Sequence, residues 1–484
     1  MHRTVLHAAV AALASIPLAL ADTYTTIDPS QRYGTWEGWG VSLAWWAKAF
    51  GDRDDLADIF FTTKTQKYQG RDLPGLGFNI ARYNAGATSY KRIGGTNMSV
   101  SPNIGASRQV DGYWLGPGSS DAASVFWDWS VDANQRLMLQ KAKANGADTF
   151  ELFSNSPMWW MCINDNPSGN DNASADNLRP GDYDLHATYL ANIDQHARQE
   201  WDIAFQSVEP FNEPSSAFWS STGTQEGCHF DVSTMDQVVA FLKTEMSKRG
   251  SGAFIAASDE NTYDAAVNTW QTMLQPTKDA ISRINVHGYQ GHDGRRDQLY
   301  ALAQASGKRL WNSEYGDGEA TGTQMAQNLL LDFSWLHPTA WVYWQAIDGG
   351  GWGLIQGNND NKMLGAVNTK YFVLAHFTRH VRPGMTILSG GNSDTVAAYD
   401  AANKVLVIVA ANWGDAGYGN FDLSLFMQAG QKGDLVRRWR TSFDGSTLYE
   451  EKEDTYVQDG ARVWSWFDPA SVQTLEVSGV DLNL

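Results

Sequence analysis

The stretch that decides the fold reads VEPFNEP and covers residues 208–214. A second stretch, LWNSEYG at residues 310–316, has the same design, because an apolar run is followed by a polar cluster that contains a glutamate. Short apolar runs of this kind are typical of buried strands. In a barrel of parallel strands, all the strand ends meet at one mouth. The two stretches therefore predict that Glu213 and Glu314 lie close together in space.

Two carboxyl groups that face each other across a sugar–sugar bond are the machinery of glycoside hydrolysis. In a chain with 54 acidic residues, the alternative for any one glutamate is a solvated surface group. Glu213 and Glu314 depart from that alternative, since each directly follows an apolar run and stands beside Asn, Trp or Tyr. The pair favours a catalytic role over a surface role.

Strand and helix signals alternate from about residue 36 to residue 348, as in a parallel α/β fold. We expect eight strands, near residues 37–44, 78–84, 149–155, 203–212, 253–258, 284–289, 309–315 and 340–345. Apolar residues at helical spacing predict helices near residues 132–145, 185–200, 234–249 and 323–335. Ser233 is expected to cap the third of these helices. The sequence therefore predicts a (β/α)8 TIM barrel over residues 36–369.

The pattern changes after residue 370. Short alternating runs are separated by Gly, Asn and Asp turns, and they lie at residues 395–399, 405–411, 435–441, 463–467 and 472–477. Such runs are typical of an antiparallel β-sandwich. Residues 24–27 also read as a strand that can join this sheet. We therefore assign residues 22–35 and 370–484 to a β-sandwich domain attached to the side of the barrel.

Residues 1–21 have the features of a secretory signal peptide. Arg3 precedes an apolar run over residues 5–18, and Ala19-Leu20-Ala21 supplies a small-x-small cleavage site. The apolar run is too short to span a membrane. We expect a secreted, extracellular, monomeric protein that starts near Asp22. Asn97 and Asn172 begin acceptor sequons for N-glycosylation, which a eukaryotic source would use.

The chain has two cysteines, Cys162 and Cys228. In an exported protein an even count favours one disulfide bond, and the alternative is a pair of free thiols. No Cys or His pair has the spacing of metal ligands, so we expect neither a metal nor another cofactor.

The formal net charge of −18 bears on the partners of the protein. A strongly acidic chain is repelled by nucleic acids and by anionic membranes, so we expect neither as a partner. A neutral substrate is not repelled by this charge, and the 21 tryptophans of the chain can stack on the apolar faces of sugar rings. These features favour a neutral carbohydrate as the substrate.

The motifs together resemble glycoside hydrolase family thirty, over nearly the whole chain that follows the signal peptide. The similarity is carried by the strand-end motifs Gly38-Trp39-Gly40, Phe78 to Arg82, Ser156-Pro157-Met158-Trp159, Asn212-Glu213-Pro214, His287-Gly288-Tyr289, Glu314 and Tyr343-Trp344. Among subgroups, the fungal secreted endo-β-1,6-galactanases look closest, especially over residues 36–46 and 342–348. Animal glucosylceramidases carry Asp-Trp-Asn where this chain has Tyr343-Trp344-Gln345, which argues against a lipid glucoside as substrate.

The resemblance implies a β-linked polysaccharide as the substrate, and a retaining mechanism with Glu314 as nucleophile and Glu213 as acid and then base. Retention requires the two carboxyl groups to lie about 5 to 5.5 Å apart. It further implies that Tyr289 orients the nucleophile and that Asn212 bonds the sugar 2-hydroxyl. Arg82 is expected to hold Glu314 charged.

Two tryptophans, Trp159 and Trp344, are the candidate sugar platforms. For both, as for Tyr289, the alternative is an ordinary place in the core, and for Arg82 it is a place on the surface.

The sequence leaves several readings open. β-1,6-Glucan or xylan remains an alternative substrate, and exo-acting cleavage an alternative mode. Endo action depends on whether loops such as 94–124 and 349–353 close one end of the cleft. A carbohydrate-binding protein without catalysis would need neither glutamate, and a metal-dependent hydrolase would need a ligand cluster that the sequence does not contain.

Overall fold

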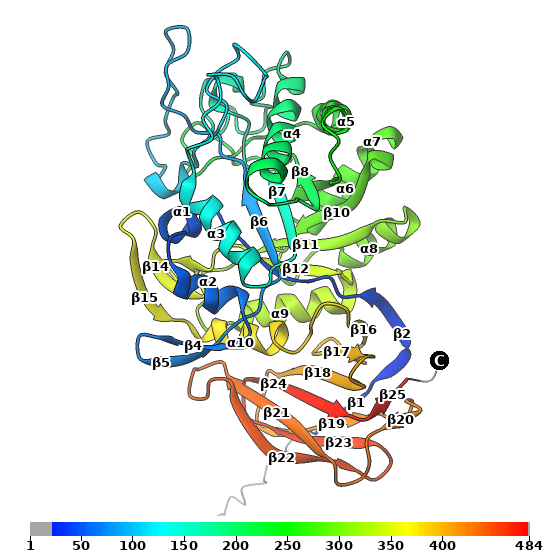
Figure 1. The fold of residues 1–484 in the computed structure, drawn as a ribbon. Helices are drawn as coiled ribbons and strands as arrows, with labels where there is room; N and C mark the ends of the chain where they lie inside the picture. The colour runs from blue at the N-terminus through cyan, green and yellow to red at the C-terminus, as the bar shows by residue number, and fades with distance from the viewer. Residues whose placement is uncertain (1–21, 483–484) are drawn as a thin grey trace, which may run out of the picture.

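The computed structural model describes residues 22–482, which form a barrel and a β-domain packed beneath it in the view of Figure 1. The predicted signal peptide lies outside the described residues. Eight parallel strands close the barrel: β3 (Gly38–Ser42), β6 (Ile80–Asn84), β7 (Thr149–Phe153), β8 (Ser207–Glu209), β9 (Phe254–Glu260), β10 (Ile281–His287), β11 (Arg309–Tyr315) and β12 (Ala340–Tyr343). The predicted (β/α)8 barrel is confirmed.

The barrel strands are buried on both faces, so their apolar runs are continuous rather than alternating. Every residue of β3, β6, β7, β8 and β12 is buried. Gly40 shows how closely neighbouring strands approach, because a Cβ atom added there would lie 2.7 Å from the Cβ of Ile80. The Gly-aromatic-Gly sequence of the first barrel strand therefore has a packing role.

Helices surround the barrel strands on the outside. They are α1 (Trp46–Phe50), α2 (Asp54–Phe61), α3 (Ala133–Ala144), α4 (Tyr183–Glu200), α5 (Val232–Lys248), α6 (Tyr263–Thr272), α7 (Gln275–Ala280), α8 (Arg296–Ala305), α9 (Thr323–Leu331) and α10 (Thr369–Thr378). Short helical turns lie at η1 (Ala106–Arg108), η2 (Trp159–Met161) and η3 (Asp332–Leu336). The predicted cap Ser233 is wrong: α5 starts at Val232, two residues before the expected start, so Ser233 lies inside the helix and Asp231 precedes it.

Ten strands make up the β-domain sheet, in the spatial order β1-β19-β23-β22-β21-β24-β18-β17-β16-β2. Their bounds are β1 (Thr23–Thr26), β2 (Asp28–Thr35), β16 (Thr386–Ser389), β17 (Thr395–Asp400), β18 (Val405–Asn412), β19 (Gly417–Asp422), β21 (Leu435–Ser442), β22 (Glu450–Gln458), β23 (Arg462–Phe467) and β24 (Ser471–Ser478). The sheet folds over one apolar core that includes Ile408, Phe421 and Val463. The pairs are antiparallel as predicted, except that β1 runs parallel to β19.

Three small sheets complete the molecule. They consist of β4 (Thr65–Tyr68) with β5 (Arg71–Pro74), of β13 (Ile347–Asp348), β14 (Ile355–Asn358) and β15 (Met363–Val367), and of β20 (Gln428–Ala429) with β25 (Val480–Asp481). The second of these follows the last barrel strand and stands beside the barrel mouth.

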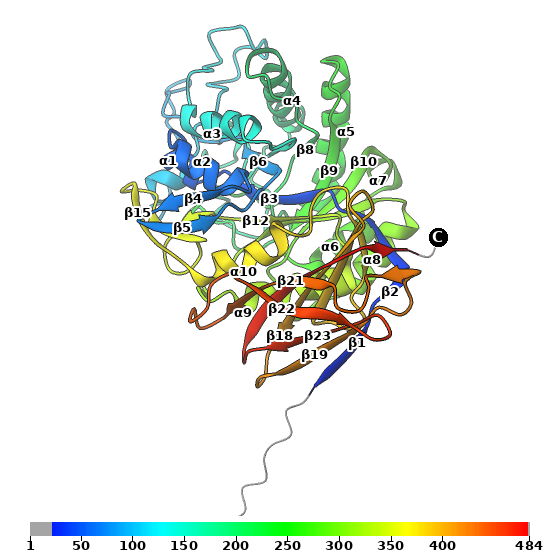
Figure 2. The ribbon, with the colours of Figure 1, turned by 60° about the horizontal axis from the view of Figure 1, so that its bottom comes forward.

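Helix α10 joins the two parts (Figure 2). All of its residues from Lys370 to Thr378 are buried. His376 uses both ring nitrogens, with Nδ1 2.9 Å from the hydroxyl of Thr474 and Nε2 2.9 Å from that of Thr441, on strands β24 and β21. Burial lowers the pKa of His376 well below its usual value, so the ring stays neutral in this interface. The β-domain is thereby fastened to the side of the barrel.

The two cysteines correct one expectation. Cys162 and Cys228 are buried free thiols, and the expected disulfide bond is absent from residues 22–482. Each thiol instead contacts backbone carbonyls: Cys162 Sγ lies 3.7 Å from the oxygens of Pro157 and Met158, and Cys228 Sγ lies 3.3 Å from that of His229. Burial raises the pKa of the Cys162 thiol to about 12, which disfavours the reactive thiolate.

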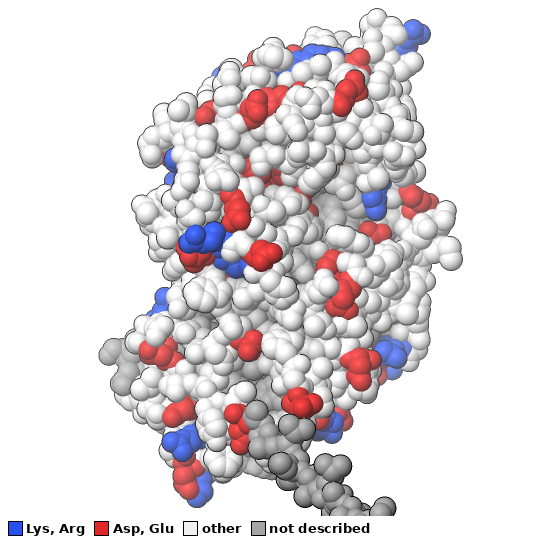
Figure 3. Space-filling view, turned by 180° about the vertical axis from the view of Figure 1, so that it is seen from behind, with Lys and Arg blue, Asp and Glu red and all other residues white. Residues whose placement is uncertain are grey.

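The surface of the described residues agrees with an acidic chain. On the face shown in Figure 3, Asp and Glu side chains are scattered among fewer Lys and Arg side chains. Asn97 and Asn172 of the two sequons are both exposed, and their glycosylation stays a prediction. Over residues 22–482 we find no helix with the length and apolar character needed to cross a bilayer.

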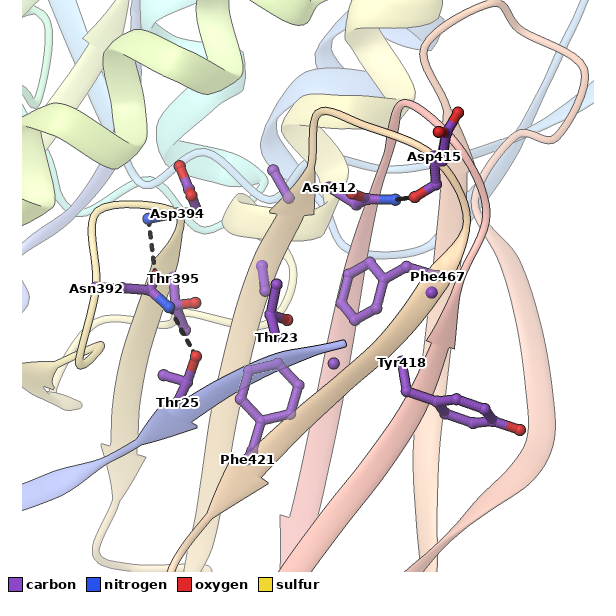
Figure 4. Close-up of a pocket in the computed structure, with 14 residues that line it drawn as sticks. Thr23, Thr25, Asn392, Asp394, Thr395, Asn412, Asp415, Tyr418, Phe421 and Phe467 are labelled. Carbon is purple, nitrogen blue, oxygen red and sulfur yellow. Dashed lines mark hydrogen bonds between the residues drawn. The ribbon is translucent and has the colours of Figure 1, made fainter. Parts of the chain in front are cut away.

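A small hollow of about 60 Å³ opens in the β-domain beside β1 (Figure 4). Phe421 and Phe467 line it, together with polar side chains that include Thr25, Asn392 and Asn412. The amide of Asn392 donates to the hydroxyl of Thr25 at 2.7 Å, which ties β1 to the turn between β16 and β17. The hollow therefore belongs to the closure of the sheet.

Candidate active site

A cavity of about 540 Å³ opens at the carboxyl ends of the barrel strands. It contains both predicted catalytic glutamates, together with Phe218, Trp219, Gly223, Thr224, Gln225, Asn261, Tyr289, Trp344 and Trp352. Active sites of barrel enzymes lie at this end, because the loops that follow the strands converge there. The cavity is therefore the candidate active site.

Glu213 and Glu314 are close enough to act on one bond. A carboxyl oxygen of Glu213 and one of Glu314 lie within 4.8 Å of each other. A retaining pair needs a separation of about 5 to 5.5 Å, whereas an inverting pair needs about 6.5 to 9.5 Å to admit a water molecule. The geometry is that of a retaining pair.

Glu213 is held in an unusual backbone conformation. Its φ angle of +49° lies in the left-handed region, which residues other than glycine seldom adopt. Its backbone N–H donates to the carbonyl of Asp259 at 2.8 Å, and its own carbonyl accepts the indole N–H of Trp219 at 2.9 Å. Strain of this kind persists only where the surroundings fix it, and it is concentrated at functional sites.

Glu314 lies between two hydrogen-bond donors. Arg82 donates to Oε2 at 3.0 Å, and the Tyr289 hydroxyl donates to Oε1 at 2.9 Å. The pKa of Tyr289 is raised well above its usual value by burial and by the negative charge of Glu314, so its hydroxyl keeps its proton and remains a donor. The structure therefore brings both predicted partners to the expected side chain.

The charge of Arg82 is shared with other carboxylates of the barrel interior. The guanidinium also donates to Glu151 at 2.9 Å and to Asp259 at 2.7 Å, and the side chain is fully buried. Burial would raise the pKa of Asp259, but Arg82 and His287 outweigh it and hold that pKa well below its usual value. Arg283 in turn contacts Glu151, which places a second cation in the same layer.

His287 stands at the centre of the site. Nδ1 lies 3.0 Å from Glu213 Oε1 and 3.5 Å from Glu314 Oε1, and Nε2 lies 3.1 Å from Asp259 Oδ2. Burial alone would lower the pKa of His287, yet the charges of Glu314 and Asp259 prevail and raise it well above its usual value. The ring is therefore a cation that faces three carboxyl groups.

Burial raises the pKa of Glu314 to about 7, although His287 and Arg82 oppose the shift. The neighbouring Glu213 carboxyl adds to the rise, because two like charges this close disfavour each other. Burial also raises the pKa of Glu209 well above its usual value, so this carboxyl is neutral. Burial and the neighbouring carboxyl thus favour the protonated form of Glu314, while the two cations favour its ionised form.

The contacts of Glu314 with cations and donors bear on its charge. Three of the buried cations, Arg82, Arg283 and His287, contact Glu151, Asp259 or Glu314. Both donors at Glu314 point at its carboxyl oxygens, as an anion requires. The arrangement therefore suits an ionised Glu314.

The tryptophans near the site differ in whether they line the cavity. Trp344 lines it and packs edge-on against Trp45, with ring centroids 5.0 Å apart. Trp352, from the loop after the last barrel strand, also lines it. Trp159 does not reach it: this ring is 1 % exposed and lies in the apolar core, so no face is free for a sugar. This corrects the prediction of Trp159 as a platform.

Asn212 is buried next to Glu213, and its Oδ1 atom has no hydrogen-bond partner within residues 22–482. Buried polar atoms are nearly always paired, so a free oxygen at this place is suited to a sugar hydroxyl. The side-chain nitrogen of Asn84, at the end of β6, likewise has no hydrogen-bond partner among the described residues.

Asn261 was missed from the sequence, and the roles of Asp259 and His287 were not assigned. Asn261 donates to Glu213 Oε1 at 2.7 Å, and it directly follows β9. Asp259 and His287 connect the pair to Arg82. A His-Gly-Tyr motif at a strand end and a polar Asp-Glu-Asn run after an apolar strand were the available signals. Their side-chain directions depend on the barrel register, which the sequence does not display.

Two groups of side chains among the described residues bring possible metal ligands within 4.8 Å of one another. The first is Glu213, His287 and Glu314, whose oxygens already accept from Arg82, Tyr289 and Asn261. The second is Asp176, His229 and Asp231, where Asp176 accepts from the backbone of Asp231 and the hydroxyl of Thr234 at the start of α5. Hydrogen bonds within the chain account for both groups.

Comparisons with known proteins identify the family of this chain. Residues 15–275 match the model of O-glycosyl hydrolase family 30. The chain is 60 % identical over 477 residues to an endo-beta-1,6-galactanase from Hypocrea rufa, covering 97 % of this chain and 99 % of that protein.

Solved structures agree at the level of the fold. A conserved exported protein from Bacteroides fragilis superposes with a TM-score of 0.77 at 18 % identity, covering 94 % of this chain and all of that one. The catalytic domain of the family 30 xylanase C from Talaromyces cellulolyticus gives 0.70 at 19 % identity, with the same coverage. By its sequence and its fold, this chain belongs to O-glycosyl hydrolase family 30.

Proposed function

We propose that the protein is a retaining endo-β-1,6-galactanase that cleaves the β-1,6-galactan side chains of arabinogalactan-proteins. The observation that carries the chemistry is the pair of carboxyl oxygens of Glu213 and Glu314 within 4.8 Å of each other at the barrel mouth. The observation that favours the substrate is the 60 % identity to the Hypocrea rufa enzyme over nearly the full length of both chains.

In the first step, an oxygen of Glu314 forms a bond to the anomeric carbon while the glycosidic bond breaks. Glu213 transfers its proton to the departing sugar oxygen. Arg82 and Tyr289 orient Glu314 for the attack, and they stabilise its charge until the bond forms. Asn261 and His287 both face Glu213 Oε1, which leaves Oε2 as the oxygen that carries the proton to the leaving group.

In the second step, Glu213 is a carboxylate and removes a proton from water. The oxygen of that water bonds to the anomeric carbon, and Glu314 leaves as a carboxylate. The anomeric configuration is retained, because the carbon has been attacked twice from opposite faces. His287 can stabilise the charge on Glu213 at this stage and that on Glu314 afterwards, since it lies within 3.5 Å of both.

Recognition of galactose requires a polar partner for its axial 4-hydroxyl. Asp348, Asn84 and Glu260 are the strand-end candidates. Glu260 is already used, because it accepts from the hydroxyls of Ser215 at 2.7 Å and Thr269. The free side-chain nitrogen of Asn84 and the partly buried carboxyl of Asp348 remain available. A polar site of this kind discriminates between hydroxyl epimers better than an apolar one.

The same proposal places the protein outside the cell as a monomer that binds a neutral polysaccharide. The acidic surface supports a neutral partner, because it repels nucleic acids and anionic lipids. Other linkages, such as β-1,6-glucan or xylan, and an exo mode of attack are the competing specificities for the same pair of glutamates.

The test compares initial rates on de-arabinosylated arabinogalactan, β-1,6-glucan and glucuronoxylan at matched concentrations, with the sizes of the products determined. We expect the galactan to be cleaved fastest, into galactose and short β-1,6-galacto-oligosaccharides. Faster cleavage of either rival would overturn the substrate and leave the catalytic pair intact. Release of a single product size from the first minutes would contradict endo action.

A further inference from the structure

We propose that Phe218 is the platform for the sugar on the leaving side of the scissile bond. This inference rests on the proposed function, because it uses Glu213 as the acid that protonates the departing oxygen. It adds a specificity-determining residue to that site.

The position of the leaving sugar follows from the direction of proton transfer. The departing oxygen must lie within hydrogen-bond reach of Glu213, so the sugar attached to it lies among the side chains around Glu213. In the cavity these side chains come from the loop over residues 214–230, which follows β8, and from Asn261 after β9. Trp344 and Trp352 come from the opposite side of the barrel, after β12.

Phe218 is the exposed ring of this loop. It lines the cavity and is 52 % exposed, whereas its neighbour Trp219 is 3 % exposed. A large apolar ring left in water forfeits the free energy that its burial would release, and a sugar presents an apolar C–H face that can cover it. An exposed ring inside a catalytic cavity therefore suits a sugar ligand.

Phe218 is also tied to the acid. Its ring contacts that of Trp219 edge-on, with centroids 4.6 Å apart, and the Trp219 indole donates to the carbonyl of Glu213 at 2.9 Å. Gly227 makes room for the indole, because a Cβ atom there would lie 2.1 Å from the Trp219 ring. The platform thus has a fixed position relative to the carboxyl group that serves the leaving oxygen.

The loop that carries Phe218 is braced against the loop that follows β6. The hydroxyl of Ser101 donates to the carbonyl of Gly223 at 2.6 Å, and the amide of Asn103 donates to that of Thr222 at 2.8 Å. The buried carboxyl of Glu226 accepts from Thr88 at 2.7 Å and from the backbone of Val110 at 3.0 Å. A wall fixed in this way is preorganised, which lowers the cost of ordering it around a sugar.

The experiment compares substrates with and without a leaving sugar. Phe218→Ala should lower kcat/KM on β-1,6-galacto-oligosaccharides by about 10-fold, because the stacking face is lost. On a β-galactobiosyl fluoride, in which fluoride replaces the leaving sugar, the same variant should match the parent enzyme. Phe218→Trp should restore activity on the oligosaccharides, and Trp464→Ala, which removes a ring 50 % exposed on the β-domain, is the matched control.

A second measurement uses transfer in the reverse direction. With the fluoride as donor and galactobiose as acceptor, the parent enzyme should form longer oligosaccharides, since the acceptor occupies the leaving-side site. Phe218→Ala should form fewer of them at the same rate of fluoride release. Equal losses on both substrates, or no loss on either, would overturn the platform. Failure of the parent enzyme to cleave galactan would instead overturn the proposed function, and the comparison would then use the polysaccharide that it does cleave.

Discussion

The interior of the barrel and the interior of the β-domain are built from different side chains. The barrel encloses ions, with Arg82, Glu151, Asp259, Arg283 and His287 all fully buried. The β-domain encloses hydrocarbon, such as Ile408, Leu475 and Val477. Burying charges costs free energy unless each is paired and hydrogen-bonded, whereas burying hydrocarbon releases it.

The difference separates the tasks of the two regions. The barrel interior keeps charges whose positions set the ionisation of Glu314. The β-domain keeps an apolar core and fastens itself to the barrel through α10. Substitutions in the first region should therefore change chemistry, and substitutions in the second should change stability.

The largest effect is expected at the nucleophile. Glu314→Gln should lower kcat by several orders of magnitude on every substrate, because the amide cannot form the covalent intermediate. The thermal unfolding transition should remain cooperative, as circular dichroism can show. Glu453→Gln, at an exposed carboxyl group of the β-domain, should retain full activity. Substantial turnover by Glu314→Gln would remove this residue from the mechanism.

Replacing the acid should be less severe and should depend on the leaving group. Glu213→Ala should cost about 10²- to 10⁴-fold on galactan, in the range of general acid–base catalysis. On a glycosyl fluoride the first step should be nearly normal, since fluoride needs little protonation. Rates would be followed by fluoride release before and after addition of azide, which attacks without a base. An equal loss on both substrates would argue against an acid role.

The contact between Tyr289 and Glu314 should tune the pH profile. Tyr289→Phe removes a donor to a carboxylate, so kcat/KM should fall by about 10- to 100-fold. The lost donor favoured the ionised form, so its removal should raise the pKa of Glu314 further. Because the nucleophile must be ionised, the acid limb of the kcat/KM profile should move to higher pH. A profile that stays in place, or moves to lower pH, would contradict this role.

The smallest effect on chemistry is expected in the β-domain. Ile408→Ala, in the middle of β18, should lower the free energy of unfolding by about 2 to 5 kcal/mol through lost burial and a residual cavity. Well below the unfolding temperature, kcat and KM on galactan should be unchanged. Urea unfolding would give the stability, and assays in the native baseline would give the kinetics. A changed kcat there would mean that the two regions are coupled.

The fold could be predicted from the sequence more completely than the site. All eight barrel strands could be located, because parallel strands buried on both faces leave continuous apolar runs such as residues 149–153. Glu213, Glu314 and Tyr289 could be named because each stands at or just after a strand end in a recognisable motif, and Arg82 because its motif marks the second barrel strand, in whose middle it lies. Trp159 could not be assigned correctly, since exposure of an aromatic ring is decided by the packing around it.

Other parts of the site depend on contacts across the barrel. His287 lies between Glu213 and Asp259, which are 74 and 28 positions away along the chain, and no local pattern encodes that meeting. The free thiols show the same limit. Their even number favoured a disulfide bond, but the loops that carry Cys162 and Cys228 direct each thiol to a nearby backbone carbonyl.

The ten-stranded sheet has a consequence for the order in which the molecule can assemble. Its two outermost strands, β1 and β2, come from the first residues of the described chain, while the eight strands between them come from its last hundred. During synthesis, β1 must wait without its partner until β19 has left the ribosome, nearly four hundred residues later. The barrel can form in the meantime, because its strands lie between these two ends of the chain. The β-domain is therefore expected to fold last, because its sheet can close only after β19 and the strands that follow it have been synthesised.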